Sequence, residues 1–558
     1  MPQTDKSGLY ALLFLILLSC VLFSFDLGGR GLWETDEGRY AEIAREMLES
    51  GDWVTPRLNY VKYFEKPPLY YWLTAASFTL FGQTEGAARF VPALFGLLGV
   101  VLTFGLGRRI SGHRTGWISG VILTVSLEYA ILARVVIIDM TLTFFMTAAL
   151  TLFYLSYKQN GELSLLGLAA VAAGLATLAK GPMGVALPGA VAVVFLTLVG
   201  GWRTFKPTTI FLSALVFLAV TTPWYLLVSL RNPEFPAFFF LDQNLGRYLT
   251  TAHQRYEPAY YYLGILAAGF FPWTAFLPAS LKTLWPGWRR PAWKQDEGLT
   301  FLLVWVVFEF VFFSLARSKM MHYILPLYPP LAILTGRLVT TWFFDGAMPR
   351  VTRPVKISYS ILALVTAALL ITGVAYPWFD PEVTYRMIMA PLTIMAVILV
   401  GGVTGSYFLF GQNKGPAAFA TLVAMTSLMI ISGVLAMNQA DPYRTVKSLA
   451  AEINRRATPA DLVVSCDDYY QGLPFYTKRR VIVFQNWGEL DFGRRRDAQA
   501  DNYFLEGAEA FDQLVGSPVR VFMVAEKGRF DRLQKLSPLP LYILARSGDK
   551  VLFSNRRG

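Results

Sequence analysis

Cysteine and histidine are scarce in this chain. Its 558 residues include two cysteines, Cys20 in an apolar run and Cys466 in the polar tail, and three histidines, His113, His253 and His322. We expect no internal disulfide between cysteines placed so differently, and the isolated histidines offer no metal-ligand spacing. The composition therefore argues against a disulfide-stapled or zinc-held fold, and it leaves the redox compartment undetermined.

Charge is also scarce. Only 16% of the residues are charged and 54% are hydrophobic, and the mean hydropathy is +0.43, which excludes an ordinary soluble domain. The net charge of +12 fits the excess of Lys and Arg that membrane proteins carry in cytoplasmic loops. No basic motif of a nucleic-acid binder and no glycine-rich nucleotide fingerprint is present. The chain is therefore predicted to be a polytopic α-helical membrane protein with the bilayer, and no nucleic acid, as partner.

Apolar runs long enough to cross a bilayer recur along most of the chain. A spanning helix needs about 20 mainly apolar residues. The first run lacks a small-x-small cleavage site before Asp26, so it is predicted to be a span and not a signal peptide. The thirteen expected spans are 8–25, 88–106, 116–133, 140–157, 163–179, 183–200, 209–230, 261–281, 300–316, 323–344, 358–376, 386–410 and 417–437.

Basic residues fall in alternate loops between these spans. They are Arg108, Arg109, Arg114, Lys158, Arg203, Lys206, Lys282, Arg289, Arg290, Lys294, Arg350, Arg353, Lys356 and Lys414. Loops rich in Lys and Arg face the cytoplasm. We therefore expect a membrane domain over 1–437 with a cytoplasmic N-terminus, a first outer loop over 26–87, and a tail over 438–558 on the outer side.

The tail changes character, since it is charged and its apolar runs are too short to span. Runs at 461–466, 481–484, 519–525 and 541–545 read as strands, and segments 443–456, 502–514 and 529–536 have helical spacing. The tail is therefore predicted to be a small α/β domain of about 120 residues.

The first outer loop is the densest polar stretch before the tail. Between Glu34 and Lys66 it holds eight carboxylates and five basic residues. The apolar positions after Asp36 have one-face helical spacing, typical of an amphipathic helix lying on a membrane, so Thr35 or Asp36 could simply cap that helix. Glu65 and Lys66 stand directly before Pro67-Pro68 and an aromatic helix, which favours a functional role at the interface over an exposed pair.

Further polar residues are expected at the same outer face. Arg134 and Asp139 lie between the third and fourth spans, Lys180 between the fifth and sixth, and His322 between the ninth and tenth. Acids and bases gathered at one face favour an enzyme that acts on lipid-linked substrates, because a transporter more often places its charges near mid-span. The simpler alternatives are a helix-end charge for Asp139 and a snorkelling cation for Lys180.

Four motifs carry a family resemblance: DEGRY at 36–40, YFEKPPL at 63–69, LAKGP at 178–182 and SKMMHYILPLYP at 318–329. The chain resembles the 4-amino-4-deoxy-L-arabinose lipid A transferases, C-type glycosyltransferases related to protein O-mannosyltransferases. The resemblance implies a C-type glycosyltransferase fold of about thirteen transmembrane helices, with juxtamembrane helices in the first outer loop and a small soluble C-terminal domain. It also implies a bacterial inner-membrane enzyme with a periplasmic active site.

The implied reaction moves the aminosugar from undecaprenyl phosphate to a phosphate of lipid A, the lipid part of lipopolysaccharide. The lower negative charge of lipid A implies resistance to polymyxin and other cationic antimicrobial peptides. By motif position, the family's acids fall on Asp36, Glu65 and Asp139, which we expect to be catalytic and to converge at the outer face.

The donor's leaving group is an anionic phosphate, which cations can stabilise as charge develops. We expect this role for Lys66, Arg39, Lys180 and Lys319. A second, weaker set of expected substrate-binding residues comprises Glu37, Tyr63, Arg134, Arg247, Arg255, His322, Tyr323 and Tyr328.

The role of Asp36 stays open. A lipid A phosphate is already largely ionised at neutral pH, its second pKa lying near about 6, so Asp36 is less needed as a base than for orienting the acceptor, pairing with the sugar's ammonium or binding a cation. No cofactor is required by the sequence, and a divalent cation on Asp36 and Glu65 is an alternative. Two other functions also stay open: a mannosyl- or arabinosyltransferase acting on protein or polysaccharide, and a polyprenyl-lipid transporter or flippase.

Overall fold

The computed structural model describes residues 6–246, 257–284, 296–346, 351–379 and 385–557. The chain divides into two compact units. The first comprises Met1–Phe25, Phe90–Tyr376 and Tyr385–Val434, and the second comprises Asp26–Arg89, Pro377–Thr384 and Leu435–Gly558. The first outer loop thus belongs to the same compact unit as the tail.

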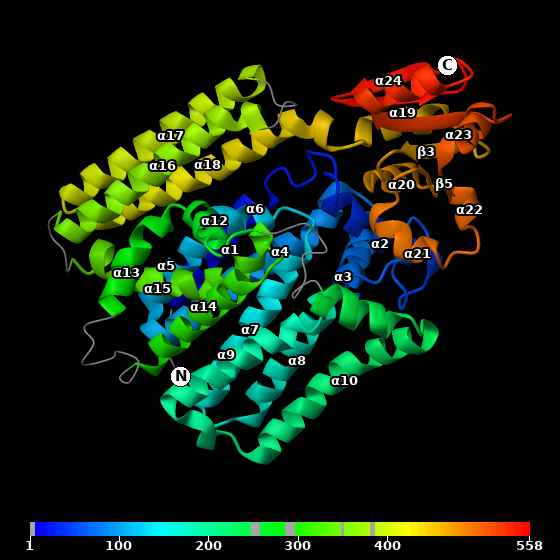
Figure 1. Cartoon of the computed structure of the whole chain (residues 1–558). Coiled ribbons are helices and arrows are strands. Elements are labelled where there is room, and N and C mark those ends of the chain that lie inside the picture. Colours follow the sequence, from blue (N-terminus) through cyan, green and yellow to red (C-terminus); the bar gives the residue numbers. More distant parts are fainter. Residues whose placement is uncertain (1–5, 247–256, 285–295, 347–350, 380–384, 558) are drawn as a thin grey trace. The chain divides into compact units, whose positions relative to one another are not determined.

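Helices make up the first unit (Figure 1). They are α1 (Lys6–Ser24), α4 (Glu85–Ser111, which begins in the second unit), α5 (His113–Thr124), α6 (Leu127–Leu132), α7 (Ile138–Lys158), α8 (Leu163–Lys180), α9 (Met183–Val199), η1 (Gly201–Thr204), α10 (Pro207–Arg231), η2 (Ala237–Gly246), α12 (Tyr261–Gly269), η3 (Trp273–Phe276), α13 (Leu277–Leu284), α14 (Glu297–Leu315), η5 (Met321–Leu327), α15 (Tyr328–Val339), η6 (Thr340–Phe344), α16 (Arg353–Phe379), α17 (Tyr385–Gly411) and α18 (Gly415–Arg444, which ends in the second unit).

Eight helices within the described residues are long and apolar enough to cross a membrane, and a bent pair, Tyr261–Gly269 with Trp273–Lys282, raises the number to nine. Two shorter apolar helices are Gly8–Ser24 and Met183–Val199. This confirms a multi-pass membrane protein.

Each of the thirteen expected spans coincides with helical structure, but two of them are broken. The third is divided between α5 and α6, and the eighth bends by 110° between its two helices. Pro272 stands in the second break, where proline removes a backbone donor and clashes with the preceding turn. The tenth runs without a gap through η5, α15 and η6. Thirteen spans therefore stays a prediction.

Helices α7 to α10 follow one another in the first unit, and α8 contacts the other three (Figure 1). Gly184 lets α9 approach α8 closely, since a Cβ there would lie 2.3 Å from the backbone of Ala176 and Thr177. Small residues permit such contacts between membrane helices. A buried aromatic cluster that includes Phe153, Phe195 and Trp305 joins α7, α9 and α14. The close approach at Ala176 and Thr177 lies about one helical turn before Lys180, one of the expected site residues.

Short helices, the two-stranded β1–β2 sheet and one six-stranded sheet make up the described part of the second unit. Its elements are α2 (Asp36–Ser50), β1 (Arg57–Leu58), β2 (Val61–Lys62), α3 (Leu69–Phe81), α19 (Lys447–Arg456), β3 (Leu462–Cys466), α20 (Gly472–Thr477), β4 (Ile482–Phe484), η7 (Gly488–Leu490), α21 (Asp491–Arg494), α22 (Ala500–Tyr503), β5 (Phe504–Leu505), α23 (Gly507–Val515), β6 (Val521–Glu526), α24 (Lys527–Leu536), β7 (Tyr542–Ser547) and β8 (Lys550–Ser554). The strand order is β5-β4-β3-β6-β8-β7.

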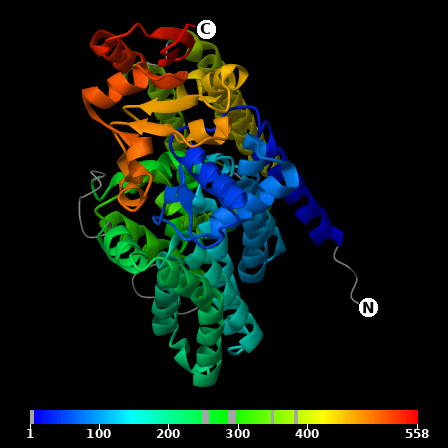
Figure 2. The ribbon, with the colours of Figure 1, turned by 90° about the vertical axis from the view of Figure 1, so that its right-hand side faces the viewer.

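The sheet has helices on both faces (Figure 2). Strands β3 to β6 pair in parallel, and β8 and β7 add an antiparallel edge. Side chains alternate along each strand, so Val464 and Met523 pack with α23 and α24 on one face, whereas Val463 and Phe522 pack with α19 and α20 on the other. The C-terminal α/β prediction is confirmed.

Details of the tail differ from expectation. The four predicted strands correspond to β3, β4, β6 and β7, but β5 and β8 were not predicted, since β5 is two residues long and β8 follows β7 after a tight turn. The expected helix over 502–514 was wrong in its first half, which is divided into α22 and β5 before α23 begins at Gly507. Gly507 has φ +86°, a left-handed conformation that interrupts a helix.

Helix α2 begins at Asp36 as expected, but its polar face is not exposed. Glu42, Arg45 and Glu46 are all buried, and Arg45 Nε donates to Glu42 Oε2 at 2.6 Å. The helix contacts both α3 and α20. The amphipathic pattern therefore reflects ion pairing inside the second unit and not a solvated face. Thr35 occupies the N-cap position of α2 but makes no side-chain capping bond. The structure therefore does not support a capping role for Thr35.

Candidate active-site clusters

Asp139 is the centre of a polar cluster in the first unit. Ile137 is extended and α7 begins at Ile138, so Asp139 lies in the first turn of the helix. Asp139 is only 4% exposed. Lys180, at the last position of α8, forms an ion pair with its carboxylate. The ammonium of Lys180 also lies 4.4 Å from the ring centroid of Tyr323, within cation–π distance. The Asp139–Lys180 ion pair therefore holds the Lys180 ammonium where the start of α7 meets the end of α8.

The 318–329 motif joins this cluster. His322 in η5 is buried, and its Nε2 lies 3.6 Å from Asp139 Oδ2. Asp139 thus faces an ammonium and an imidazole from two other elements. Lys319 is also buried, and its Nζ donates to the carbonyls of Glu257 at 2.8 Å and Ala316 at 2.5 Å. Two of the three N–H groups of this ammonium are therefore committed to the protein.

Two residues of the weaker set mainly join helices. Arg134 donates to the carbonyls of Leu22, at 2.7 Å, and Phe25, so it satisfies carbonyls that the end of α1 leaves open. Tyr328 is fully buried and donates to Glu128. Glu128 is thus the structural partner of another helix, as its apolar surroundings indicate.

Asp36 and Arg39 form a second cluster, in the second unit. Arg39 Nη1 donates to Asp36 Oδ1 at 2.7 Å, and Arg39 Nε lies 2.7 Å from Glu489 Oε2 in η7. Tyr63 Oη lies 3.4 Å from the same Glu489 oxygen. The guanidinium expected to bind the donor phosphate is therefore oriented by two carboxylates.

Glu37, next to Asp36, faces a different environment. It is buried and accepts hydrogen bonds from Arg30, Arg89 and the backbone N–H of Trp33. Burial alone would raise its pKa, but the charges and hydrogen bonds of Arg89 and Arg30 lower the pKa of Glu37 to about 2. The geometry makes Glu37 an anchor between α2 and the start of α4, and gives no sign of its expected contact with substrate.

Glu65 and Lys66 lie in the loop that leads into α3, and Lys66 Nζ donates to the carbonyl of Glu65 at 3.1 Å. Asp36 and Glu65 belong to the second unit and Asp139 to the first, so convergence of these acids stays a prediction. Arg247 and Arg255 lie outside the described residues.

Asp36 and Glu65 are the residues expected to hold a divalent cation, if one takes part. Among the residues that the structure describes, no group of three or more His, Cys, Asp or Glu side chains is placed to hold a metal ion. A cation held by Asp36 and Glu65 together with substrate phosphates and water stays an alternative prediction.

One residue of these clusters escaped the sequence analysis. Glu489 stands in the tail, which contributes little to the family resemblance, and lies 450 positions from Arg39. No local pattern around Gly488–Leu490 distinguishes it from the other acids of the tail. Only the fold of the second unit reveals its contact with α2.

Two protein family models match parts of this chain. Residues 8–239 match the family model described as dolichyl-phosphate-mannose-protein mannosyltransferase. Residues 449–555 match the aminoarabinose transferase C-terminal domain. The two models cover the part that carries Asp36, Glu65 and Asp139 and most of the tail.

Three named relatives match this chain over most of its length. The chain is 29% identical over 503 residues to the undecaprenyl phosphate-alpha-4-amino-4-deoxy-L-arabinose arabinosyl transferase of Yersinia pestis (strain Pestoides F), covering 88% of each chain. It is 27% identical to the enzyme of the same name from Yersinia enterocolitica, over 97% of this chain and 96% of that one. The crystal structure of ArnT from Cupriavidus metallidurans bound to undecaprenyl phosphate matches with a TM-score of 0.84 and 29% identity, covering 98% of both chains.

Proposed function

This chain belongs to the 4-amino-4-deoxy-L-arabinose lipid A transferase family, and we propose that it transfers this aminosugar from undecaprenyl phosphate to phosphate groups of lipid A. The product would carry less negative charge, which would weaken the binding of polymyxin and other cationic antimicrobial peptides. The observation that carries the proposal is the match, over nearly the whole of both chains, to a solved relative with undecaprenyl phosphate bound.

The polar clusters supply the chemistry that this reaction needs. Cleavage of the sugar–phosphate bond leaves negative charge on the polyprenyl phosphate, and preorganised cations lower the free energy of that transition state. Lys180, held by Asp139 and Tyr323, is one such cation. Arg39, held by Asp36 and Glu489, is another. Lys66 and Lys319 complete the proposed donor-phosphate set.

The acids have separate proposed roles. Asp139 fixes the position of Lys180 and faces His322. Asp36 orients Arg39 through Oδ1. Its Oδ2 would then bind the ammonium of the sugar, or a cation that holds the acceptor phosphate. Glu65 precedes α3, where it would face the sugar or the acceptor.

Location follows from the loop charges. We place the chain in the bacterial inner membrane, with its N-terminus in the cytoplasm and the C-terminal domain and active site in the periplasm. Reporter fusions after residue 437 test this placement, because alkaline phosphatase is active only outside the cytoplasm. Phosphatase activity at that junction is the expected result, and a reporter active only in the cytoplasm would overturn the placement.

A second function has one observation in its favour. The mannosyltransferase model matches residues 8–239, which would fit transfer of a sugar to protein or polysaccharide. The match of the tail to an aminoarabinose transferase domain and the named relatives favour lipid A as acceptor.

Mass spectrometry of lipid A decides between these functions. Cells that make the aminosugar donor but lack their own transferase should gain aminoarabinose-modified lipid A when they express this chain. A variant with Asp139→Asn, present in the membrane at the same level, should not restore the modification. Unmodified lipid A together with newly glycosylated protein would favour the alternative.

A further inference from the structure

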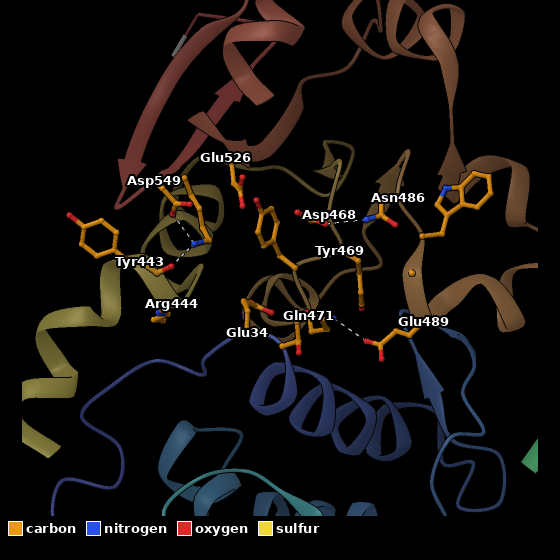
Figure 3. A pocket seen from close by; sticks show the side chains of 15 residues that line it. Glu34, Tyr443, Arg444, Asp468, Tyr469, Gln471, Asn486, Glu489, Glu526 and Asp549 are labelled. Atoms are coloured by element: carbon orange, nitrogen blue, oxygen red, sulfur yellow. Dashed lines mark hydrogen bonds and ion pairs between the residues drawn. The ribbon is translucent and has the colours of Figure 1, made fainter. Parts of the chain in front are cut away.

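A polar pocket of about 380 Å³ lies wholly within the second unit (Figure 3). Residues from the start of α2, the end of α18 and the loops after β3, β4, β6 and β7 line it. Its volume falls in the range of small-molecule sites. The proposed donor chemistry uses none of its lining residues except Glu489, which also orients Arg39.

Acidic side chains dominate the lining. Five carboxyl groups and two cations contribute: Glu34, Asp468, Glu489, Glu526, Asp549, Arg444 and Lys550. Figure 3 shows Asp468, Glu526 and Asp549 on one side of the pocket and Glu34 and Glu489 on the other. Opposed carboxyl groups favour a cation between them.

Two of these acids are matched by protein cations. Glu489 pairs with Arg39, and Asp549 Oδ1 accepts from Lys550 Nζ at 2.9 Å. The remaining three, Glu34, Asp468 and Glu526, have no basic side chain within ion-pairing distance in the described part of the chain.

The hydrogen bonds that Asp468 and Glu34 accept come from neutral donors. Asp468 accepts a bond from the amide of Asn486 at 3.2 Å. Glu34 accepts bonds from the backbone N–H of Gly472 at 3.0 and 3.3 Å. Burial raises the pKa of Glu34 to about 8, as expected for a carboxyl group without a cationic partner. Asp468 and Glu526 are therefore acids that no basic side chain of the described residues pairs with, whereas a pKa of about 8 keeps Glu34 mostly protonated at neutral pH.

Buried polar atoms at this pocket also lack partners. The hydroxyls of Tyr469 and Tyr470 and the side-chain oxygen of Gln471 make no hydrogen bond in the described structure, although these residues are only 8%, 6% and 5% exposed. Glu526, Asp468 and Asp549 act on the Tyr470 hydroxyl electrostatically and, together with burial, raise its pKa. Buried groups of this kind usually have a hydrogen-bond partner, so the Tyr470 hydroxyl and the Gln471 oxygen are available to a ligand with several hydrogen-bonding groups.

The surroundings distinguish an organic cation from a metal ion. Metal ligands must meet at one point, and no group of three acidic, His or Cys side chains does so in the described residues. Tyr443, Tyr469, Tyr470 and Trp487 line the pocket instead. Aromatic rings attract organic ammonium groups and cover the apolar faces of small rings.

We propose that this pocket binds a small hydroxylated primary amine, an aminosugar or a compound of similar size. Its ammonium would lie between Glu526 and Asp468, with Glu34 as a hydrogen-bond acceptor, and its hydroxyls would bond to Tyr470 and Gln471. The site shares Glu489 with the Arg39 cluster but includes none of the cations proposed to contact the donor phosphate, and its existence does not depend on which sugar the enzyme transfers.

The test measures binding of D-glucosamine to the purified full-length protein at neutral pH by titration calorimetry. N-acetylglucosamine is the control ligand, since it keeps the sugar ring but lacks the ammonium. We expect glucosamine to bind at least tenfold more tightly than N-acetylglucosamine. Equal binding of the two sugars, absence of glucosamine binding, or displacement of glucosamine by calcium would overturn the proposal.

Variants locate the bound amine. Glu526→Gln and Asp468→Asn should each weaken glucosamine binding about tenfold, the scale of one charge-assisted hydrogen bond, whereas Glu509→Gln, an exposed acid of α23, should leave it unchanged. Asp36→Asn should keep glucosamine binding although the proposed transfer fails, which separates this site from the donor site. Loss of binding in Asp36→Asn, with Glu526→Gln unaffected, would instead place the amine at the donor site.

Discussion

Arg39 in α2 and Glu489 in η7 form an ion pair, with Arg39 Nε 2.7 Å from Glu489 Oε2. Gln471 adds a hydrogen bond to the other oxygen of Glu489 at 3.0 Å. An arginine of the first outer loop is thus oriented by a carboxylate of the tail, within one compact unit. The C-terminal domain therefore has a structural connection to a residue that we propose binds the donor.

Glu489→Gln tests this connection. The substitution keeps the shape but removes the charge that orients Arg39, so we expect sugar transfer to fall about 10-fold to 100-fold, the scale of one charge-assisted hydrogen bond. The fall should appear mainly as a higher KM for the polyprenyl donor. Glu509→Gln is the matched control, and full activity in both variants would remove Glu489 from the positioning role.

Asp36→Asn and Glu37→Gln should separate activity from stability in adjacent residues. Asp36 touches only Arg39 among the contacts that the structure defines for it, so Asp36→Asn should abolish transfer with little change in Tm. Glu37→Gln leaves Arg30 and Arg89 buried without their counter-charge, which should cost about 3–5 kcal/mol of folding free energy. Thermal unfolding and a transfer assay on both variants check this division, and the opposite pattern would contradict it.

Asp139→Asn should lower both activity and Tm, because the partly buried charge of Lys180 would lose its carboxylate partner. The double variant Asp139→Asn with Lys180→Met removes the charge as well, and we expect its Tm to recover while transfer stays absent. Recovery of transfer along with Tm would mean that the pair is structural only. A folded, fully active Asp139→Asn variant would reduce Asp139 to a helix-end charge.

Glu34 should make stability depend on pH. Burial raises its folded-state pKa from 4.5 to about 8, so the folded chain binds a proton more tightly than the unfolded chain does. This contribution to stability is fully present below about pH 4.5 and is lost as pH rises toward 8. Glu34→Gln removes the dependence, so wild type should lose more Tm than the variant between pH 5 and pH 8, and parallel losses would contradict the assignment.

Local patterns in the sequence were enough to predict the class of protein. Apolar runs locate helices because a membrane span requires about 20 apolar residues in succession. Short apolar segments such as those of β3 and β6 locate strands, and the 318–329 motif indicates that His322 lies near other site residues. All of these features depend on neighbours in the chain.

The tertiary structure alone decided which charges meet. The amphipathic pattern of α2 predicts a polar face, yet that face is buried because Glu42 and Arg45 neutralise each other within the fold. Glu489 reaches Arg39, and Glu34 meets Asp468 and Glu526 around one pocket, only because the tail and the first outer loop belong to one compact unit. The energy of a buried charge depends on partners that are distant in sequence, and so no local pattern could assign Asp36 and Glu37 their different environments.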